Sequence, residues 1–204
     1  MLLLLARHGE TDDNARLIFQ GQGGGPLNAR GRAQAERLAS RLAKSVDLIV
    51  SSDLLRAKET AEHVRRASGV EIVFDREIRE IDVGAWTGLA YDEVERRFAE
   101  EWAAWRAGLD VARGGGETYA GLATRVSSAL RRIARDHVGK RVLVVSHGAA
   151  LRSAVCVALG ISPSFHAPLA GMHNTALSSL RYDDEKFHLV SYNDVAHLHD
   201  LEGS

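Results

Sequence analysis

The chain of 204 residues is 45% hydrophobic and 26% charged, with a formal net charge of -1 at pH 7. It is long enough for one domain with a well-buried core, and it has no basic field that would attract nucleic acid or an anionic membrane. Since the apolar run at its start is too short for a signal peptide or a membrane span, we expect a cytoplasmic protein with a small-molecule partner, and a homodimer is compatible with the sequence.

The first predicted element is a buried strand over residues 2–6, which ends abruptly at Arg7-His8-Gly9. A glycine-rich loop follows at residues 19–27, and it is either a flexible connector or a backbone cradle for a phosphate. Asn28 and Gly69 are expected to cap helices. The pattern predicts further strands at residues 46–50, 70–74 and 141–146, and helices at residues 29–43, 54–67, 91–107, 117–137 and 149–159.

The chain closes with a predicted hairpin, residues 176–182 and 187–193, that turns at Asp183-Asp184. Strands that alternate with helices predict an α/β fold with a doubly wound, mostly parallel sheet, an antiparallel edge strand and helices on both faces. We expect one domain over residues 1–204, with residues 75–117 inserted as a helical lid above the carboxyl edge of the sheet.

Two predicted strands end in the same way, one at Arg7-His8-Gly9 and the other at Ser146-His147-Gly148. Ligands of such sheets bind beyond the carboxyl ends of the strands. A lone histidine after an apolar run is more often structural than catalytic. Because two strands deliver a histidine and a glycine to the same edge, we expect His8 and His147 to share a functional site.

Four motifs in this order resemble the histidine phosphatase superfamily, the phosphoglycerate-mutase-like proteins. They are Arg-His-Gly-Glu-Thr at residues 7–11, the arginine motif at 51–61, the glutamate motif at 78–88 in its phosphatase form, and Ser-His-Gly at 146–148. The resemblance extends from about Leu2 to Leu198. It implies a doubly wound α/β domain and chemistry on phosphate esters.

A phosphate monoester is a dianion with a poor leaving group, so its enzyme needs a nucleophile, cationic donors and an acid. The resemblance implies that His8 becomes a phosphohistidine and that His147 donates to a phosphoryl oxygen. It implies that Arg7 and Arg56 hold the phosphoryl oxygens, for which the fixed fork of a guanidinium is suited. No metal and no cofactor are implied.

The proton donor and acceptor implied by the resemblance is Glu80, with Glu77 and Asp82 as nearby rivals. An outer set of polar residues matches positions that reach the phosphoryl group, although capping or turn roles explain some of them equally well. We expect the phosphate contacts from Asn14, Gln20, Gly21 and Gly148, and leave a structural role open for Glu117, Thr118 and Asn174.

The remaining reactive side chains have no motif around them. Cys156 lies in an apolar run and is expected to be a buried, unreactive thiol. Seven histidines have no partner at a useful spacing and are expected to be structural or exposed: His63, His137, His166, His173, His188, His197 and His199.

The sequence leads to three hypotheses on function. The first is a metal-independent hydrolase of small organic phosphomonoesters that works through phospho-His8. The second is a phosphoglycerate mutase that uses the same pocket and requires a bisphosphate primer. The third is a non-catalytic protein that binds phosphate ligands on the same fold, and the intact set of motifs argues against it.

Overall fold

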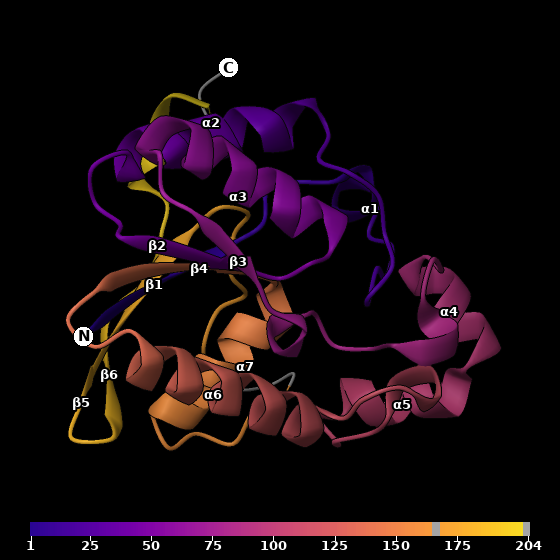
Figure 1. The fold of residues 1–204 in the computed structure, drawn as a ribbon. Helices are drawn as coiled ribbons and strands as arrows, with labels where there is room; N and C mark the ends of the chain where they lie inside the picture. Colours follow the sequence, from indigo (N-terminus) through magenta and orange to yellow (C-terminus); the bar gives the residue numbers. More distant parts are fainter. Residues whose placement is uncertain (165–167, 202–204) are drawn as a thin grey trace.

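A computed structural model of the chain describes residues 1–164 and 168–201, and its centre is a six-stranded sheet in the order β3-β2-β4-β1-β5-β6 (Figure 1). Strands β3, β2, β4 and β1 are parallel, whereas β5 runs antiparallel to both β1 and β6. The strands are β1 (Leu2–Arg7), β2 (Leu48–Ser51), β3 (Ile72–Phe74), β4 (Arg141–Ser146), β5 (Leu177–Asp183) and β6 (Lys186–Asp194).

Helices cover both faces of the sheet, with α2 and α3 on one side and α6 and α7 on the other (Figure 1). Side chains alternate along β1: Leu3 and Leu5 belong to the core under α6 and α7, and Leu4 and Ala6 to the core under α2 and α3. The α-helices are α1 (Asp12–Ala15), α2 (Ala29–Leu42), α3 (Leu55–Ser68), α4 (Tyr91–Arg97), α5 (Ala99–Arg106), α6 (Tyr119–Asp136) and α7 (Gly148–Ala158).

Most predicted elements are present, with shifts of one or two residues at their ends. The predicted strand at residues 141–146 matches β4, while β2 and β3 each begin two residues later than expected. The side chain of Asn28 accepts from the N–H of Gly31 at the start of α2, and Gly69 ends α3 with a left-handed φ of 75°. The hairpin turns one residue later than expected, at Asp184-Glu185, and both of these residues have positive φ, as a two-residue hairpin turn requires.

The single helix predicted over residues 91–107 is wrong. Phe98 leaves the helical conformation at φ -129° and ψ 44° and divides the segment into α4 and α5. The break brings aromatic side chains from both helices together, because the ring of Phe98 lies 6.3 Å from that of Trp86 and the ring of Tyr91 lies 5.9 Å from that of Trp102. Four short 3-10 helices complete the described elements: η1 (Arg76–Ile78), η2 (Gly84–Trp86), η3 (Arg113–Gly115) and η4 (Ala196–Leu201).

The inserted segment, residues 75–117, forms the lid beyond the carboxyl ends of the parallel strands, with α4 and α5 at the right of Figure 1. Phe19 joins it to the rest of the domain, since its backbone N–H donates to Leu89 and its carbonyl accepts from Gly88. The ring of Phe19 stacks on Tyr91 at 4.3 Å and meets Trp105 edge-on at 5.7 Å. Aromatic packing therefore fixes the lid over the sheet edge.

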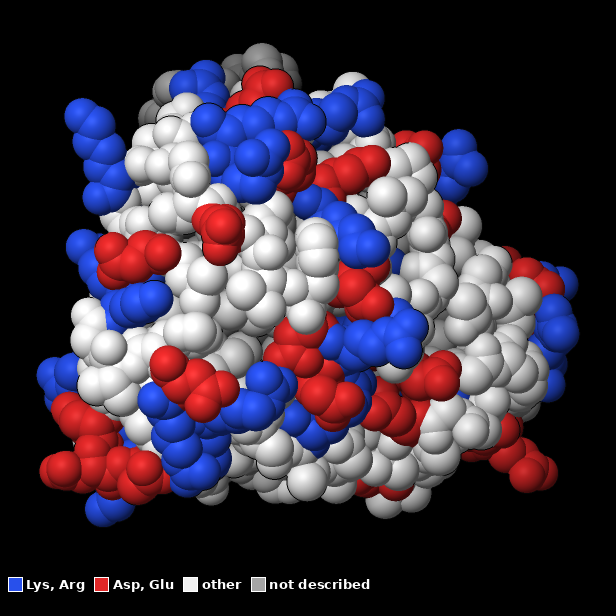
Figure 2. Space-filling view, in the orientation of Figure 1, with Lys and Arg blue, Asp and Glu red and all other residues white. Residues whose placement is uncertain are grey.

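The surface carries charge of both signs. On the face drawn in Figure 2, basic and acidic side chains are interspersed rather than gathered into a field of one sign. None of the helices that the structure describes is both long and apolar enough to cross a membrane.

Candidate active site

A cavity of about 650 Å³ opens at the carboxyl ends of β1 and β4, under the lid. Every predicted catalytic or phosphate-binding residue lines it except His147, whose ring lies behind that of His8 at a centroid distance of 5.2 Å. The predicted residues in its wall are Arg7, His8, Asn14, Gln20, Gly21, Arg56, Glu80 and Gly148.

His8, just after β1, is buried and has both ring nitrogens engaged. Its Nδ1 lies 2.7 Å from the carbonyl oxygen of Gly9, which can only accept, so Nδ1 carries the proton. Its Nε2 accepts a hydrogen bond of 3.2 Å from Nε of Arg56. Burial and then the charges of Arg56 and Arg7 hold the pKa of His8 well below its ordinary value. The imidazole is therefore neutral, with its lone pair on Nε2.

Arg56 projects from the first turn of α3 and its guanidinium is held by the glycine-rich loop. Its Nη2 donates to the carbonyl of Gly21 at 2.8 Å, and its Nη1 donates to the carbonyl of Gly23. Gly24, at φ 91°, has no room for a side chain, because a Cβ would lie 2.6 Å from Oε1 of Gln20. The loop thus acts through its carbonyl groups on Arg56. Burial lowers the pKa of Arg56 to about 10, so the side chain stays charged at neutral pH.

Arg7 supplies a second, partly buried cation from the end of β1. Its Nη1 donates to the carbonyl of Met172 at 2.6 Å, and its Nε has no partner within the described ranges. Burial lowers the pKa of Arg7, against the opposing charge of Glu80. Gly148 lies beside it, because a Cβ built on Gly148 would be in ordinary contact with Nε of Arg7 at 3.4 Å.

His147 is fully buried between β4 and α7. Its Nε2 lies 2.8 Å from Oγ of Ser52, and its Nδ1 has no hydrogen-bond partner in the part of the chain that the structure describes. Burial, followed by the charge of Arg56, lowers the pKa of His147 well below its ordinary value. Ser52 fixes the orientation of this ring, a role that the sequence alone did not reveal.

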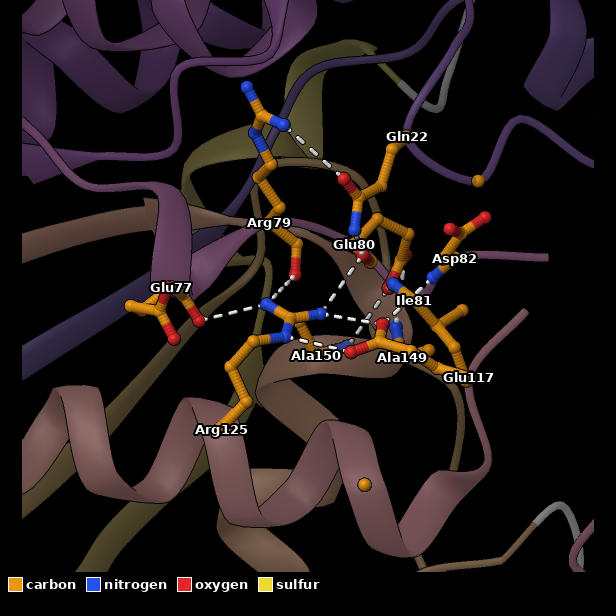
Figure 3. A network of polar contacts seen from close by, with 12 residues as sticks. Gln22, Glu77, Arg79, Glu80, Ile81, Asp82, Glu117, Arg125, Ala149 and Ala150 are labelled. Carbon is orange, nitrogen blue, oxygen red and sulfur yellow. Dashed lines mark hydrogen bonds and ion pairs between the residues drawn. The ribbon is translucent and has the colours of Figure 1, made fainter. Parts of the chain in front are cut away.

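Glu80 reaches the amino terminus of α7 from the lid (Figure 3). Its Oε1 accepts from the backbone N–H groups of Ile81 at 2.9 Å and Ala150 at 3.1 Å, and its Oε2 accepts from Ala149 at 3.2 Å. Unpaired N–H groups at a helix start stabilise negative charge. The rivals Glu77 and Asp82 are exposed and do not line the cavity.

Arg125 of α6 fixes the backbone that carries Glu80 (Figure 3). Its guanidinium donates to the carbonyl of Glu77 at 2.9 Å and to that of Glu80 at 3.3 Å, and it pairs with Glu117 at 2.7 Å. Burial works to raise the pKa of Glu117, but the hydrogen bonds from Arg125 and from the N–H of Asp82, together with the charges of Arg125 and Arg113, lower it overall. Glu117 also accepts from the N–H of Asp82. Sequence reasoning found Glu117 but missed Arg125, which lies in an ordinary helical pattern.

The outer residues divide into structural and site-facing groups. Thr118 caps α6 by accepting from the N–H of Gly121, so its structural interpretation is confirmed. Asn14 forms a capping box with Thr11 through Oδ1, which leaves its amide group for the cavity that it lines. Asn174 donates to the carbonyl of His8 at 2.9 Å and so supports the nucleophile candidate from behind.

Side chains that the sequence assigned no role lie mostly away from this cavity. None of His63, His137, His173, His188, His197 and His199 lines it, and His166 lies outside the described residues. Cys156 is buried, and burial raises the pKa of its thiol, as expected for an unreactive cysteine. Among the described residues, no group of three His, Cys, Asp or Glu side chains is placed to hold a metal ion.

Comparison with known proteins agrees with this geometry. The family model described as histidine phosphatase superfamily (branch 1) matches residues 3–195. The chain is 36% identical to phosphoglycerate mutase-like protein 4 of Arabidopsis thaliana, over 96% of this chain and 86% of the relative.

Two solved structures with a similar fold are both phosphatases. A mycobacterial glucosyl-3-phosphoglycerate phosphatase in complex with VO3 superposes with a TM-score of 0.86 at 29% identity, covering 94% of this chain and 98% of the other. Phosphoserine phosphatase from Entamoeba histolytica, in complex with 3-phosphoglyceric acid, superposes with a TM-score of 0.87 at 26% identity, covering 97% of this chain and 98% of the other.

Proposed function

Since the chain belongs to the histidine phosphatase superfamily, we propose that it is a metal-independent hydrolase of small organic phosphomonoesters that works through a phosphohistidine at His8. The observation that carries the proposal is the state of His8: a neutral ring with its proton on Nδ1 and its lone pair on Nε2, next to the charges of Arg56 and Arg7. A neutral imidazole between cations is poised to attack a phosphoryl dianion.

In the first step the phosphoryl group of the substrate lies between Arg7 and Arg56, and its oxygens replace the contact between Arg56 and Nε2 of His8. Nε2 then attacks phosphorus as the bond to the leaving oxygen breaks. The proton stays on Nδ1, which keeps donating to the carbonyl of Gly9, and this hydrogen bond stabilises the positive charge that develops on the ring. His147 donates from Nδ1, the ring nitrogen that has no protein partner in the described ranges.

The leaving oxygen needs a proton, and Glu80 supplies it. Its Oε2 accepts only the one bond from Ala149, so this oxygen has capacity to carry a proton toward the cavity. In the second step a water molecule attacks phospho-His8, Glu80 takes a proton from that water, and the bond between phosphorus and Nε2 breaks. Inorganic phosphate and the neutral imidazole result.

A second candidate function is a phosphoglycerate mutase, which the name of the Arabidopsis relative favours. In that reaction the phosphoryl group on His8 returns to another hydroxyl of a bound phosphoglycerate rather than to water. The two functions share the same first step. They differ in the acceptor of the phosphoryl group and in the need for a bisphosphate primer.

The test measures phosphate release from a panel of phosphomonoesters in excess chelator, together with conversion of 3- to 2-phosphoglycerate with and without primer. We expect chelator-resistant release, complete loss in His8→Ala, and no change in His173→Ala, which alters an exposed histidine. Full activity of His8→Ala would end the proposal. Primer-dependent isomerisation with little release would favour the mutase, and ligand binding without any turnover would favour the non-catalytic hypothesis.

A further inference from the structure

Arg113 is a buried cation in the wall of the cavity, and two of its guanidinium nitrogens have no hydrogen-bond partner among the residues that the structure describes. It lies in η3 of the lid and is only 3% exposed. Its Nε and Nη2 find no acceptor within the described part of the chain, and its guanidinium lies 4.4 Å from the ring centre of Tyr119. Contact with an aromatic face offsets some of the cost of burying this charge, but it leaves the N–H groups unsatisfied.

The backbone, rather than a partner for the guanidinium, fixes Arg113 in this place. The glycines that follow it pack directly on the loop of Glu80: a Cβ on Gly114 would lie 2.6 Å from the carbonyl of Val83, and one on Gly116 would lie 2.3 Å from the carbonyl of Asp82. The N–H of Gly114 also donates to Glu101 at 2.8 Å. Arg113 is thus held at the cavity by contacts that do not depend on its own side chain.

Two other arginines of the site, the buried Arg56 and the partly buried Arg125, show what Arg113 lacks. Arg56 donates to two loop carbonyls, and Arg125 pairs with Glu117 and donates to three more. Buried polar groups in proteins almost always have partners, so an orphaned guanidinium in a cavity wall indicates that the partner arrives with the ligand.

Arg113 is also separate from Arg7 and Arg56, the two arginines that are proposed to hold the phosphoryl group. Arg7 and Arg56 come from the sheet edge, whereas Arg113 comes from the lid. Tyr91 also lines this cavity. Burial and Tyr119 raise the pKa of its hydroxyl, while the charges of Arg7 and Arg113 both oppose that rise. Because Arg7, Arg56 and Arg113 all line the same cavity, one ligand can contact cations from both the sheet edge and the lid.

We propose that Arg113 is a specificity-determining residue that binds a carboxylate of the substrate, so that the preferred substrates are small phosphomonoesters that carry a carboxylate on the same carbon frame. A guanidinium binds a carboxylate through two parallel hydrogen bonds. A single cation neutralises one negative charge, which matches a carboxylate better than a second phosphoryl dianion. The inference rests on the proposed function in treating the ligand as a substrate.

The experiment compares pairs of ligands that differ in the carboxylate alone: O-phosphoserine with O-phosphoethanolamine, and 3-phosphoglycerate with glycerol 3-phosphate. Binding is measured by calorimetry on His8→Ala, which needs no turnover, and kcat/KM is measured on the chain with His8 intact. Both are repeated with Arg113→Gln, with Arg113→Lys, and with the control Arg96→Gln, which alters a lid arginine that is 73% exposed.

We expect the carboxylated member of each pair to bind at least tenfold more tightly, and Arg113→Gln to lower its kcat/KM about a hundredfold, as the loss of a buried charge pair does. The uncarboxylated member should change less than about threefold, Arg113→Lys should recover part of the loss, and Arg96→Gln should change nothing. Equal binding of the two members by the chain with Arg113 intact overturns the inference without any variant. Equal losses on both members of a pair would also overturn it, because they indicate a structural role.

The two proposals can fail separately. Tighter binding of carboxylated ligands that depends on Arg113, without phosphate release, would refute the hydrolase and keep the carboxylate site. Hydrolysis that is indifferent to the carboxylate would keep the hydrolase and refute the carboxylate site. Failure of every ligand to bind would refute both.

Discussion

At the scale of single residues, the contribution of Glu80 to the rate should depend on the leaving group of the substrate. Its carboxylate serves as the proton donor only where the leaving oxygen needs a proton. We expect Glu80→Gln to lower kcat about 100- to 1000-fold for an alkyl phosphate, which is the usual worth of general acid catalysis. For p-nitrophenyl phosphate, whose leaving group is stable as an anion, the first step should slow far less. Steady-state and burst kinetics with both substrates measure the difference.

Glu77→Gln is the matched control for this variant, because Glu77 is a carboxylate in the same segment that is exposed and outside the cavity wall. It should leave both rates unchanged. An equal loss in the burst rate of the first step on both substrates in Glu80→Gln, with an unchanged melting temperature, would contradict the role of proton donor. A drop in melting temperature would instead report the three backbone hydrogen bonds that the carboxylate accepts.

At the scale of elements, the lid is joined to the sheet edge by backbone packed on backbone. Gly114, at φ 56°, lies against the carbonyl of Val83 and the N–H of Ala85. Gly114→Ala forces these two segments apart, so we expect a loss of about 2–4 kcal/mol in the free energy of unfolding. Activity should fall as well, since the displaced segments carry Glu80 and Arg113. Urea unfolding and kcat/KM at a temperature below the transition measure both effects.

The neighbouring Gly115 provides the control for Gly114→Ala. It also has positive φ, 77°, but a Cβ there would meet no atom within 4 Å. Gly115→Ala should therefore cost only the backbone strain of a left-handed residue, about 1 kcal/mol. Equal losses in the two variants would show that strain, and not the close approach of the two segments, dominates at this joint.

At the scale of the whole molecule, two buried neutral histidines link stability to pH. The folded-state pKa values of His8 and His147 both lie below the ordinary 6.5, so the unfolded chain takes up protons first as the pH falls. The contribution of these two histidines to the free energy of unfolding is complete above about pH 6.5 and is lost below it. We expect the free energy of unfolding to fall by about 1.4 kcal/mol per pH unit for each histidine in that range. Urea unfolding between pH 7.5 and 5 tests this.

The variant His8→Asn should remove one of the two titrating groups and so reduce the slope of the free energy of unfolding against pH. His173→Asn, at an exposed position, should leave this slope unchanged. Identical slopes for all three chains would assign the acid sensitivity to other groups. The charges of Arg56 and Arg7 also lower the pKa of His8. A bound phosphate ligand that neutralises these charges should therefore change the pH range over which the free energy of unfolding falls.

The elements with a strong local signal could be predicted from the sequence. The apolar runs, the cap at Asn28 and the glycine at position 69 mark ends that are set by nearby residues. The four family motifs brought His8, Arg56, Glu80 and His147 into one expected site, and their side chains do meet at the carboxyl edge of the sheet.

Features set by distant contacts could not be predicted in this way. The break at Phe98 has no glycine or proline to mark it, and the contact of its ring with Trp86 forms only in the folded chain. Four-residue α1 is too short to show a period. Arg125 and Ser52 act on residues far along the chain, and no local pattern shows that Nε and Nη2 of Arg113 will have no hydrogen-bond partner among the described residues after folding.

The central place of β1 in the sheet has a consequence for how the chain matures on the ribosome. β1 is synthesised first, yet its two neighbours, β4 and β5, begin at Arg141 and Leu177. The apolar strand β1 must therefore remain unpaired until β4 and β5 have been made, and exposed strand edges favour aggregation. Arg7 obtains its backbone partners Met172 and Thr175 only after β4 has been made. The nascent domain should consequently depend on chaperones until then, and its active site should form late.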